Sequence, residues 1–190
     1  MTLNINDLKG VSPELRAFLQ RLGAVGIPFA TPVNAVASTS TLSVALNPAL
    51  GETFTIGSKV YEFVAAAAAD GEITLEALVA DTRLNIVAAI NGLDGINTAS
   101  ADVTAAAFAG NNSVLTAIVR GVAGNSIATA ETMAGAGNGI TAMAGGVNGT
   151  EGVRGAVCAD ATRIYVCIAA NTISGANWRR TPAAAALEAF

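Results

Sequence analysis

The 190-residue sequence contains no histidine, and this absence removes several kinds of chemistry. Without an imidazole, Ser-His or Cys-His activation of a nucleophile and histidine ligation of a metal are excluded. The 14 carboxylates are scattered singly, and the closest pair, Asp70 and Glu72, flanks Gly71 in an expected turn. A two-carboxylate glycosidase site would have to be assembled from distant residues. We therefore expect a chain with no enzymatic activity, no bound metal and no cofactor.

Charged and aromatic residues are also scarce. Charged residues make up 13% of the chain, aromatic residues 5%, and the formal net charge is −4. Nucleic-acid binding needs a concentrated basic surface, so we expect no nucleic-acid partner. With one Trp and two Tyr, the chain also lacks the several exposed aromatics of a sugar-binding platform. Trp178 is expected to complete a core instead.

Only two cysteines are present, Cys158 and Cys167, and they form no CxxC motif. A metal site is therefore not expected. We expect the two cysteines on the two strands of a hairpin over residues 155–181, in a register that does not place them opposite each other. The sequence predicts two reduced, packed thiols.

Long uncharged runs occur, but proline, glycine or asparagine interrupts each of them. A membrane-spanning helix needs about 20 mostly apolar, helix-compatible residues, so no membrane span is expected. The opening residues MTLNINDLKG place Asp7 and Lys9 where a secretory signal would need a basic start followed by an apolar run, so no such signal is expected.

Alanine and glycine are abundant instead, with 41 and 20 residues, and 52% of the chain is hydrophobic. Small side chains predict thin, closely spaced layers. A chain this apolar with so few charges would expose large apolar patches unless partners covered them, and self-association, most simply a homotrimer, is expected.

The sharpest local signal is SPELRAFLQRLG, which predicts a short amphipathic helix over residues 12–22. Ser12 can cap it, Pro13 suits the first helical position and Gly23 suits a left-handed stop. This helix could pack on its own domain or dock on another subunit. Pro28, Pro32 and a Ser/Thr cluster predict an extended arm after it, which favours docking. The candidate anchoring residues are Leu15, Phe18, Leu19, Leu22, Ile27 and Phe29.

The predicted fold class is α+β and mostly β: a helix and arm (1–40), a β-rich module with one packed helix (41–152), and a β-hairpin unit with a tail (153–190). TFTI-GS-KVYEFV predicts a hairpin that turns at Gly57-Ser58 and leaves Thr53, Thr55, Lys59 and Glu62 toward solvent. EITL is expected to continue the sheet.

The second half of the module begins with an expected helix from about Asp81 to Gly92, with Leu84, Val87, Ala88 and Asn91 on one face. A second hairpin turning at Gly110-Asn111-Asn112 and a strand in NSIATAET are expected to follow. The helix should lie across the sheet. We expect residues 134–149 to be a glycine-rich connector.

The C-terminal stretch RIYVCIAANTISGANWRRTP is expected to be the second strand of the last hairpin, followed by an exposed loop, NTISGAN. Ile164, Val166 and Ile168 should pack inward, and Trp178 should cover the end of the small sheet. Arg179 and Arg180 should face solvent or a neighbour.

Four stretches carry a family resemblance: GETFTIGSKVYEFV, ADTRLNIVAAING, TAIVRGVAGNSIAT and AGGVNGTEG. Their order and spacing over residues 50–152 resemble a module of virion structural proteins of tailed bacteriophages. The stretch GVRGAVCADATRIYVCIAANTISGANWRR resembles a short β motif that closes phage head-decoration, head-fibre and tail-fibre proteins. The resemblance brings no catalytic residues with it.

The resemblance implies a capsid decoration or head-fibre protein that binds the major capsid protein lattice on the virion exterior, after assembly in the host bacterial cytoplasm. A tail, baseplate or tail-fibre component is the alternative. A receptor- or glycan-binding virion protein, in contact with the host surface, also stays open.

Overall fold

The computed structural model describes residues 31–159 and 163–180, which belong to two compact units. The large unit is Val36–Val147, and the small unit joins residues 31–35 to the chain from Asn148 onward. Strands dominate the described residues, and the fold is α+β and mostly β, as the sequence predicts. The expected helix at residues 12–22 lies outside the described residues.

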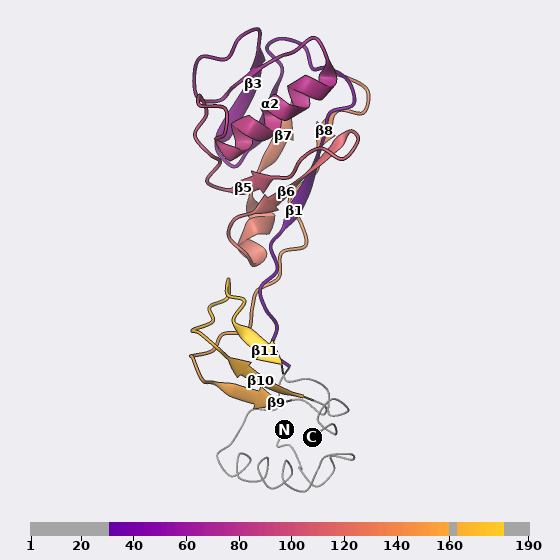
Figure 1. The fold of residues 1–190 in the computed structure, drawn as a ribbon. Coiled ribbons are helices and arrows are strands. Elements are labelled where there is room, and N and C mark those ends of the chain that lie inside the picture. The colour runs from indigo at the N-terminus through magenta and orange to yellow at the C-terminus, as the bar shows by residue number, and fades with distance from the viewer. Residues whose placement is uncertain (1–30, 160–162, 181–190) are drawn as a thin grey trace, which may run out of the picture. The chain divides into compact units, whose positions relative to one another are not determined.

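Eight strands of the large unit form two four-stranded sheets (Figure 1). One sheet has the order β5-β6-β1-β8 and consists of β5 (Val103–Ala105), β6 (Asn112–Ala117), β1 (Thr39–Ser43) and β8 (Gly139–Ile140). The other has the order β4-β3-β2-β7 and consists of β4 (Glu72–Thr74), β3 (Lys59–Val64), β2 (Thr53–Ile56) and β7 (Thr129–Glu131). Only the β3–β4 pair is parallel; the other pairs are antiparallel.

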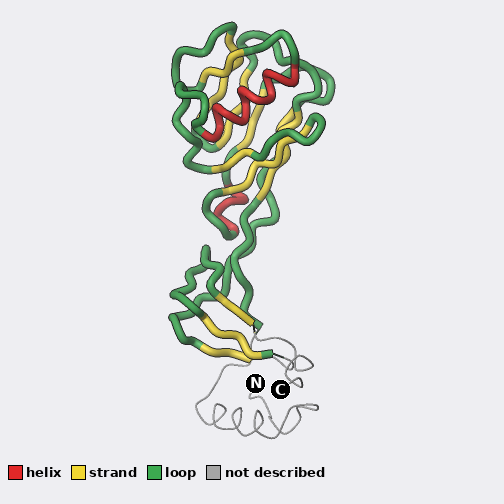
Figure 2. The backbone as a smooth tube through the Cα atoms, in the orientation of Figure 1, coloured by secondary structure: helices red, strands yellow, loops and turns green. Residues whose placement is uncertain are grey.

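The helix α2 (Val79–Asn91) closes the large unit by contacting β4 and β5, an edge strand of each sheet. At the opposite edges β7 lies beside β8, so the two sheets and the helix surround a common interior. Figure 2 shows the helix crossing the strands. The expected helix is present, but the strands that were expected to form one sheet form two, and the helix contacts an edge strand of each.

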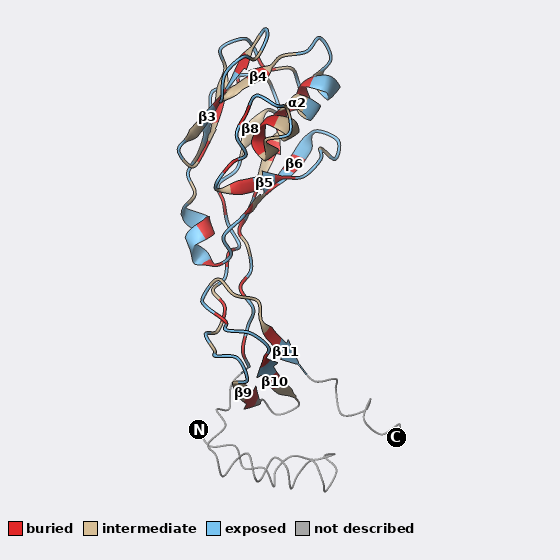
Figure 3. Cartoon of the chain, turned by 60° about the vertical axis from the view of Figure 1, so that its left-hand side comes forward, coloured by how far each residue is buried: buried red, intermediate tan, exposed pale blue. Residues whose placement is uncertain are grey.

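The helix α2 ends at the residue that the sequence predicts, but its first residue and its buried face differ from the predicted ones. Gly92 stops the helix in the left-handed region (φ 67°), and the Leu93 N–H donates to the Ala88 carbonyl at 2.8 Å. The helix begins at Val79, two residues before Asp81. Its buried residues are Thr82, Ile86, Ala89 and Ile90, whereas Leu84 is 68% exposed. Figure 3 shows α2 with both buried and exposed segments. The two β-branched isoleucines one turn apart set the buried face, which corrects the expected one.

Both predicted hairpins of the large unit are present, and a glycine makes each turn. Gly57 (φ 62°) lies between the paired residues Ile56 and Lys59, and Gly110 (φ 63°) follows Ala109, which pairs with Asn112. A positive φ at the first turn position favours glycine and matches the twist of a two-residue hairpin. In the first hairpin Glu62 is exposed, whereas Thr53, Thr55 and Lys59 are half-buried.

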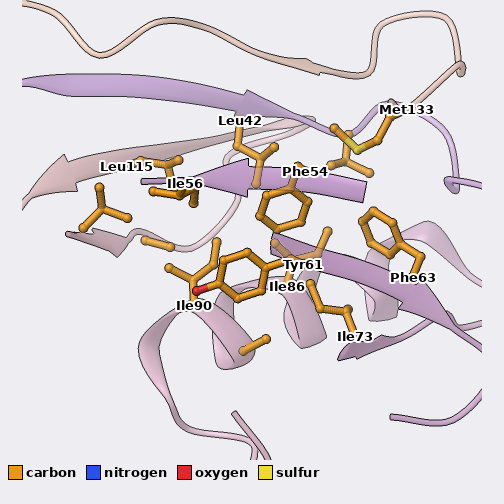
Figure 4. Close-up of a cluster of buried hydrophobic side chains, with 14 of the residues drawn as sticks. Leu42, Phe54, Ile56, Tyr61, Phe63, Ile73, Ile86, Ile90, Leu115 and Met133 are labelled. Carbon is orange, nitrogen blue, oxygen red and sulfur yellow. The ribbon is translucent and has the colours of Figure 1, made fainter. Parts of the chain in front are cut away.

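The core of the large unit fills the space between the two sheets and α2 (Figure 4). Phe54 and Tyr61 stack with ring centroids 4.9 Å apart, and Phe63 packs against Phe54 at 5.9 Å. All three are completely buried. Burying a large apolar side chain contributes about 1.5–3 kcal/mol, so this aromatic group is a main source of stability.

Two stretches that were expected to lie outside the sheets pair with strands of the large unit. Residues 39 and 40 belong to β1, which pairs with β6 and β8 in the middle of its sheet, and Ser38 and Ser40 are buried. This corrects the expectation that the arm extends unpacked as far as residue 40. The glycine-rich stretch 134–149 contains β8 and places Val147 opposite Val36, so it is more than a connector. Small side chains without clear alternation gave no strand signal in either stretch.

The predicted strand in NSIATAET is shorter than expected. A 3₁₀ helix, η2 (Val122–Ser126), occupies its first residues, and β7 begins only at Thr129. The predicted strand in EITL is confirmed as β4.

The small unit contains a three-stranded antiparallel sheet with the order β11-β10-β9, made of β11 (Trp178–Arg180), β10 (Ile164–Cys167) and β9 (Val157–Ala159). The predicted hairpin is therefore two strands of a larger sheet. Residues 31–35 join this unit through backbone bonds, Ala35 N–H to Gly175 O and Thr150 N–H to Val33 O, both 2.8 Å.

The inward face of β10 is the opposite of the expected one. Tyr165 and Cys167 are buried, whereas Val166 and Ile168 are 36% and 48% exposed. The run IYVCI is apolar at every position, so alternation alone could not assign its faces. The buried neighbours Cys158 and Trp178, which pair with Tyr165 and Cys167, decide the assignment.

Candidate functional site

The predicted anchoring residues Leu15, Phe18, Leu19, Leu22, Ile27 and Phe29 all lie outside the described residues. In the described part of the chain, the candidate functional groups are its polar and ionisable side chains. Most of these side chains bond to backbone groups, and this determines what they can do chemically.

Asparagine side chains form hydrogen bonds with backbone groups at the edges of the sheets. Asn91, at the end of α2, accepts from the Ala105 N–H and donates to the Ala105 carbonyl, both at 2.9 Å, and so pairs with β5 as a neighbouring strand would. Asn97 does the same for β4: it accepts from the Gly71 N–H at 2.6 Å and donates to the Glu72 carbonyl at 2.8 Å. Two edges that would otherwise offer unpaired backbone groups are thereby occupied.

The same arrangement recurs in three other places. Asn34 pairs with both backbone groups of Trp178 on β11, and Asn125 pairs with both backbone groups of Gly146. Asn138 accepts from the Ala45 and Leu46 N–H groups and donates to the Leu46 carbonyl. Sequence reasoning missed this role, because asparagine in a loop gives no local signal of a distant strand edge. The one available signal was Asn91 on a helix expected to cross a sheet.

The carboxylates of the large unit close turns rather than converge. Glu52 accepts from the Ala49 N–H at 2.8 Å and the Ala134 N–H at 2.9 Å, and these bonds, that from Ala134 first, lower its pKa. Glu72 accepts from Ala68 and Ala69 beside the predicted turn at Gly71 (φ 91°). These oxygens face backbone donors, which suits a structural role.

Lys59 and Asp70 form an ion pair of 2.6 Å between β3 and the loop before β4. The Lys59 ammonium also donates to the Thr98 carbonyl at 2.6 Å, and Asp70 accepts from the Thr98 N–H at 2.8 Å. The hydrogen bond from Lys59 is the main reason that the pKa of Asp70 is lowered. The pair therefore fastens residues 97–98 to the hairpin.

Tyr61 is the strongly perturbed titratable group of the large unit. Burial raises its pKa from 10.0 to about 12, and the nearby carboxylates Asp70, Asp102 and Asp94 add to the rise. A phenol that stays protonated so far above neutral pH cannot act as a general base there. Its stacking on Phe54 fits a role in the core.

In the small unit Cys158 and Cys167 form no disulfide, and both are buried. Cys158 pairs in register with Tyr165, not with Cys167, so the prediction of two unbridged, packed thiols is confirmed. The Cys167 thiol donates to the Ala169 carbonyl at 2.8 Å. Neither sulfur is presented to solvent.

Trp178 completes the core of the small unit, as expected, but from within β11 rather than from a position over the end of the sheet. Its indole N–H donates to the Thr150 carbonyl at 2.7 Å, and a Cβ at Gly152 would lie 2.6 Å from the ring. A buried indole cannot serve as a sugar-stacking platform.

The predicted exposed loop NTISGAN is only partly exposed, because Asn171 at its start is buried and accepts from the Asn177 N–H at 2.7 Å. Arg179 and Arg180 are exposed, as predicted.

Within residues 31–159 and 163–180, no three His, Cys, Asp or Glu side chains lie together as a metal site would require. Among the same residues, no helix is both long enough and apolar enough to cross a membrane. Comparisons with protein-family models, with curated protein sequences and with solved structures gave no match.

Proposed function

We propose that this chain is a non-catalytic structural protein of a tailed-bacteriophage virion, a decoration or head-fibre protein that binds the major capsid protein lattice and self-associates, most simply as a trimer. The observation that carries the proposal is the resemblance of the stretches from GETFTIGSKVYEFV to AGGVNGTEG to a virion module. The first three stretches and the start of the fourth fall within the single packed unit Val36–Val147.

The use of polar side chains in the large unit supports a structural role. Asn91 and Asn97 occupy strand edges, and Glu52, Glu72 and Asp70 bond to backbone groups or to Lys59. In such a scaffold the polar side chains form hydrogen bonds that hold the loops in place. That suits a protein whose task is to present a rigid surface on a particle.

The surface of the large unit supports the existence of a partner. Leu46, Leu50 and Leu78 are each more than half exposed, and the Asn47 side chain, which donates to the Glu76 carbonyl at 2.8 Å, ties the loops that carry them together. Exposed leucines on neighbouring loops are costly in water unless another molecule covers them.

Attachment through the N-terminal residues is part of the proposal. The stripe Leu15, Phe18, Leu19 and Leu22 is too short to be stable as an isolated helix, so it needs a surface to pack on. Residues 31–40 form backbone hydrogen bonds within the small and the large unit. We therefore place the proposed capsid anchor before residue 31.

The test adds purified full-length protein to phage particles that lack it and measures the bound copies after sedimentation. Phe18→Asp should reduce occupancy at least about tenfold, because it places a charge in a contact worth about 1.5–3 kcal/mol per buried side chain. Gln20→Asp adds the same charge at a position that the sequence predicts to lie on the opposite face of the helix, and this variant should bind normally. If wild-type protein fails to bind heads or binds tails instead, the decoration proposal is wrong. Normal binding by Phe18→Asp would exclude the helix as the anchor.

A further inference from the structure

Charge is divided unequally between the two units. Residues 36–147 carry nine acidic and three basic residues, a formal charge of −6. The described part of the small unit carries four arginines against one carboxylate, Glu151, a formal charge of +3. Opposite charges on the two units would attract between copies, and each unit has one surface where charged and exposed apolar side chains lie together.

On the large unit this surface is the outer side of the β4-β3-β2-β7 sheet. Tyr61 and Phe63 of β3 point into the core, so Val60 and Glu62 point outward, and Val60 is 50% exposed. Glu62 pairs in register with Glu72 of β4, which places two acidic residues on neighbouring strands. We call Val60, Glu62 and Glu72 the acidic face.

The Glu72 carboxylate accepts from the Ala68 and Ala69 N–H groups at 2.7 and 2.9 Å, whereas no Lys or Arg among residues 31–159 and 163–180 forms an ion pair with Glu62. Lys59 forms an ion pair with Asp70 and lies on the inward side of β3, next to Tyr61. Like charges on adjacent strands destabilise a sheet modestly. A basic group from another molecule would relieve that repulsion.

On the small unit the matching surface is the outer side of the β11-β10-β9 sheet. Val166 pairs in register with Val157 on one side and Arg179 on the other, which gives a row of two valines and an arginine across three strands. Ile168, 48% exposed, extends this row along the chain. We call Val157, Val166, Ile168 and Arg179 the basic face.

Arg179 is held in a position suited to reach a partner. Its guanidinium donates to the Ala176 carbonyl at 2.9 Å and the Trp178 carbonyl at 3.1 Å, while the residue stays exposed. These bonds restrict its rotamers, so less conformational entropy is lost when a carboxylate binds. The row of valines beside it offers apolar area.

We propose that the basic face of one copy binds the acidic face of a second copy, through Arg179 and Glu62 across a contact of Val166 and Val60. The inference rests on the self-association in the proposed function and assigns surfaces to it. Such a contact joins unlike surfaces, which is the type of interface that builds cyclic oligomers such as trimers.

The contact should be weak and sensitive to salt. A stable protein interface buries about 800 Å² per partner, and a face of three short strands offers less than that. Charged groups at the rim of a contact act through long-range attraction, which salt screens over about 10 Å at 0.1 M. Self-association should therefore weaken as ionic strength rises.

Sedimentation velocity of the full-length protein over a range of concentrations, at low and at physiological salt, tests the proposal. Glu62→Arg and Arg179→Glu should each raise the dissociation constant at low salt by about tenfold or more. The double variant Glu62→Arg/Arg179→Glu restores opposite charges and should recover most of the lost affinity. Asp81→Arg makes the same charge change as Glu62→Arg on α2, away from the sheet, and should change the dissociation constant less than about twofold.

Each other outcome overturns the pairing of faces in a distinct way. Equal weakening by Glu62→Arg and Asp81→Arg would show that net charge, not the acidic face, matters. A double variant as weak as the single variants would show that the two residues do not meet. If Arg179→Glu lowers capsid occupancy while Glu62→Arg does not, the basic face binds the capsid. A wild-type monomer at every concentration would overturn self-association, whereas attachment to particles would still be tested separately.

Discussion

The two units are stabilised in different ways. The large unit has sixteen buried hydrophobic residues in one core, including the stacked Phe54 and Tyr61. Among the described residues of the small unit, the buried cluster consists of two thiols and two aromatic rings, Cys158, Cys167, Tyr165 and Trp178. A core of few side chains stabilises a fold less. In this part of the small unit the side chains of Asn34 and Asn171 bond to backbone groups and add to its stability. We therefore expect the two units to differ in stability.

The largest expected effect concerns the core of the large unit. Phe54→Ala removes a completely buried ring and should lower the free energy of unfolding of this unit by about 3–5 kcal/mol. Denaturant unfolding followed by hydrogen exchange of peptides from residues 36–147 measures it. Leu84→Ala, at an exposed helix position, should stay within about 0.5 kcal/mol. A large effect at Leu84 would restore the face predicted from the sequence.

Trp178 makes the comparison measurable, because it is the only tryptophan and lies in the small unit. In Phe54→Ala the fluorescence transition of Trp178 should keep its wild-type midpoint, since the two cores are separate clusters. A transition that shifts together with the exchange of residues 36–147 would contradict independent units.

The next effect concerns the strand edges. Asn91→Asp keeps an acceptor for the Ala105 N–H but loses the donor and sets a carboxylate against the Ala105 carbonyl, so we expect a loss of about 1–3 kcal/mol. In Asn112→Asp the matching bond survives, because Asn112 only accepts there, from the Ser43 hydroxyl at 2.8 Å. Equal losses in the two variants, measured by denaturant unfolding, would show that the edge bond of Asn91 is not important.

How far the sequence predicted these features depends on how local their causes are. The turns at Gly57 and Gly110, the stop at Gly92 and the unbridged cysteines followed from neighbouring residues and register. The faces of α2 and β10 did not, because LNIVAAIN and IYVCI are apolar on more than one side and the partners that decide come from distant strands. The asparagine contacts span up to 144 residues, as between Asn34 and Trp178, and no local pattern encodes them.

A smaller effect follows from the buried phenol. The pKa of Tyr61 is about 12 in the folded chain and 10.0 for an ordinary tyrosine, so the unfolded chain loses this proton first as pH rises. The stability that Tyr61 contributes is therefore complete below pH 10 and is lost between pH 10 and pH 12, by about 1.4 kcal/mol per unit at most. Tyr61→Phe, measured by denaturant unfolding across this window, should show a shallower decline. An identical decline would mean that other groups cause it.

The smallest expected effect is that of reductant on the small unit. Because Cys158 and Cys167 form no disulfide, the Trp178 fluorescence transition should not change when reductant is added, and both thiols should react after denaturation without reductant. A bridge found by mass spectrometry would contradict the register in which Cys158 faces Tyr165.

The proposed decoration of the phage head can be tested by locating this chain on the virion. Purified virions labelled with gold-conjugated antibody against the chain and imaged in negative stain distinguish head from tail. The account predicts gold spread over the capsid surface at many sites per particle. Gold confined to the tail, baseplate or fibres, or absent from intact virions, would contradict it.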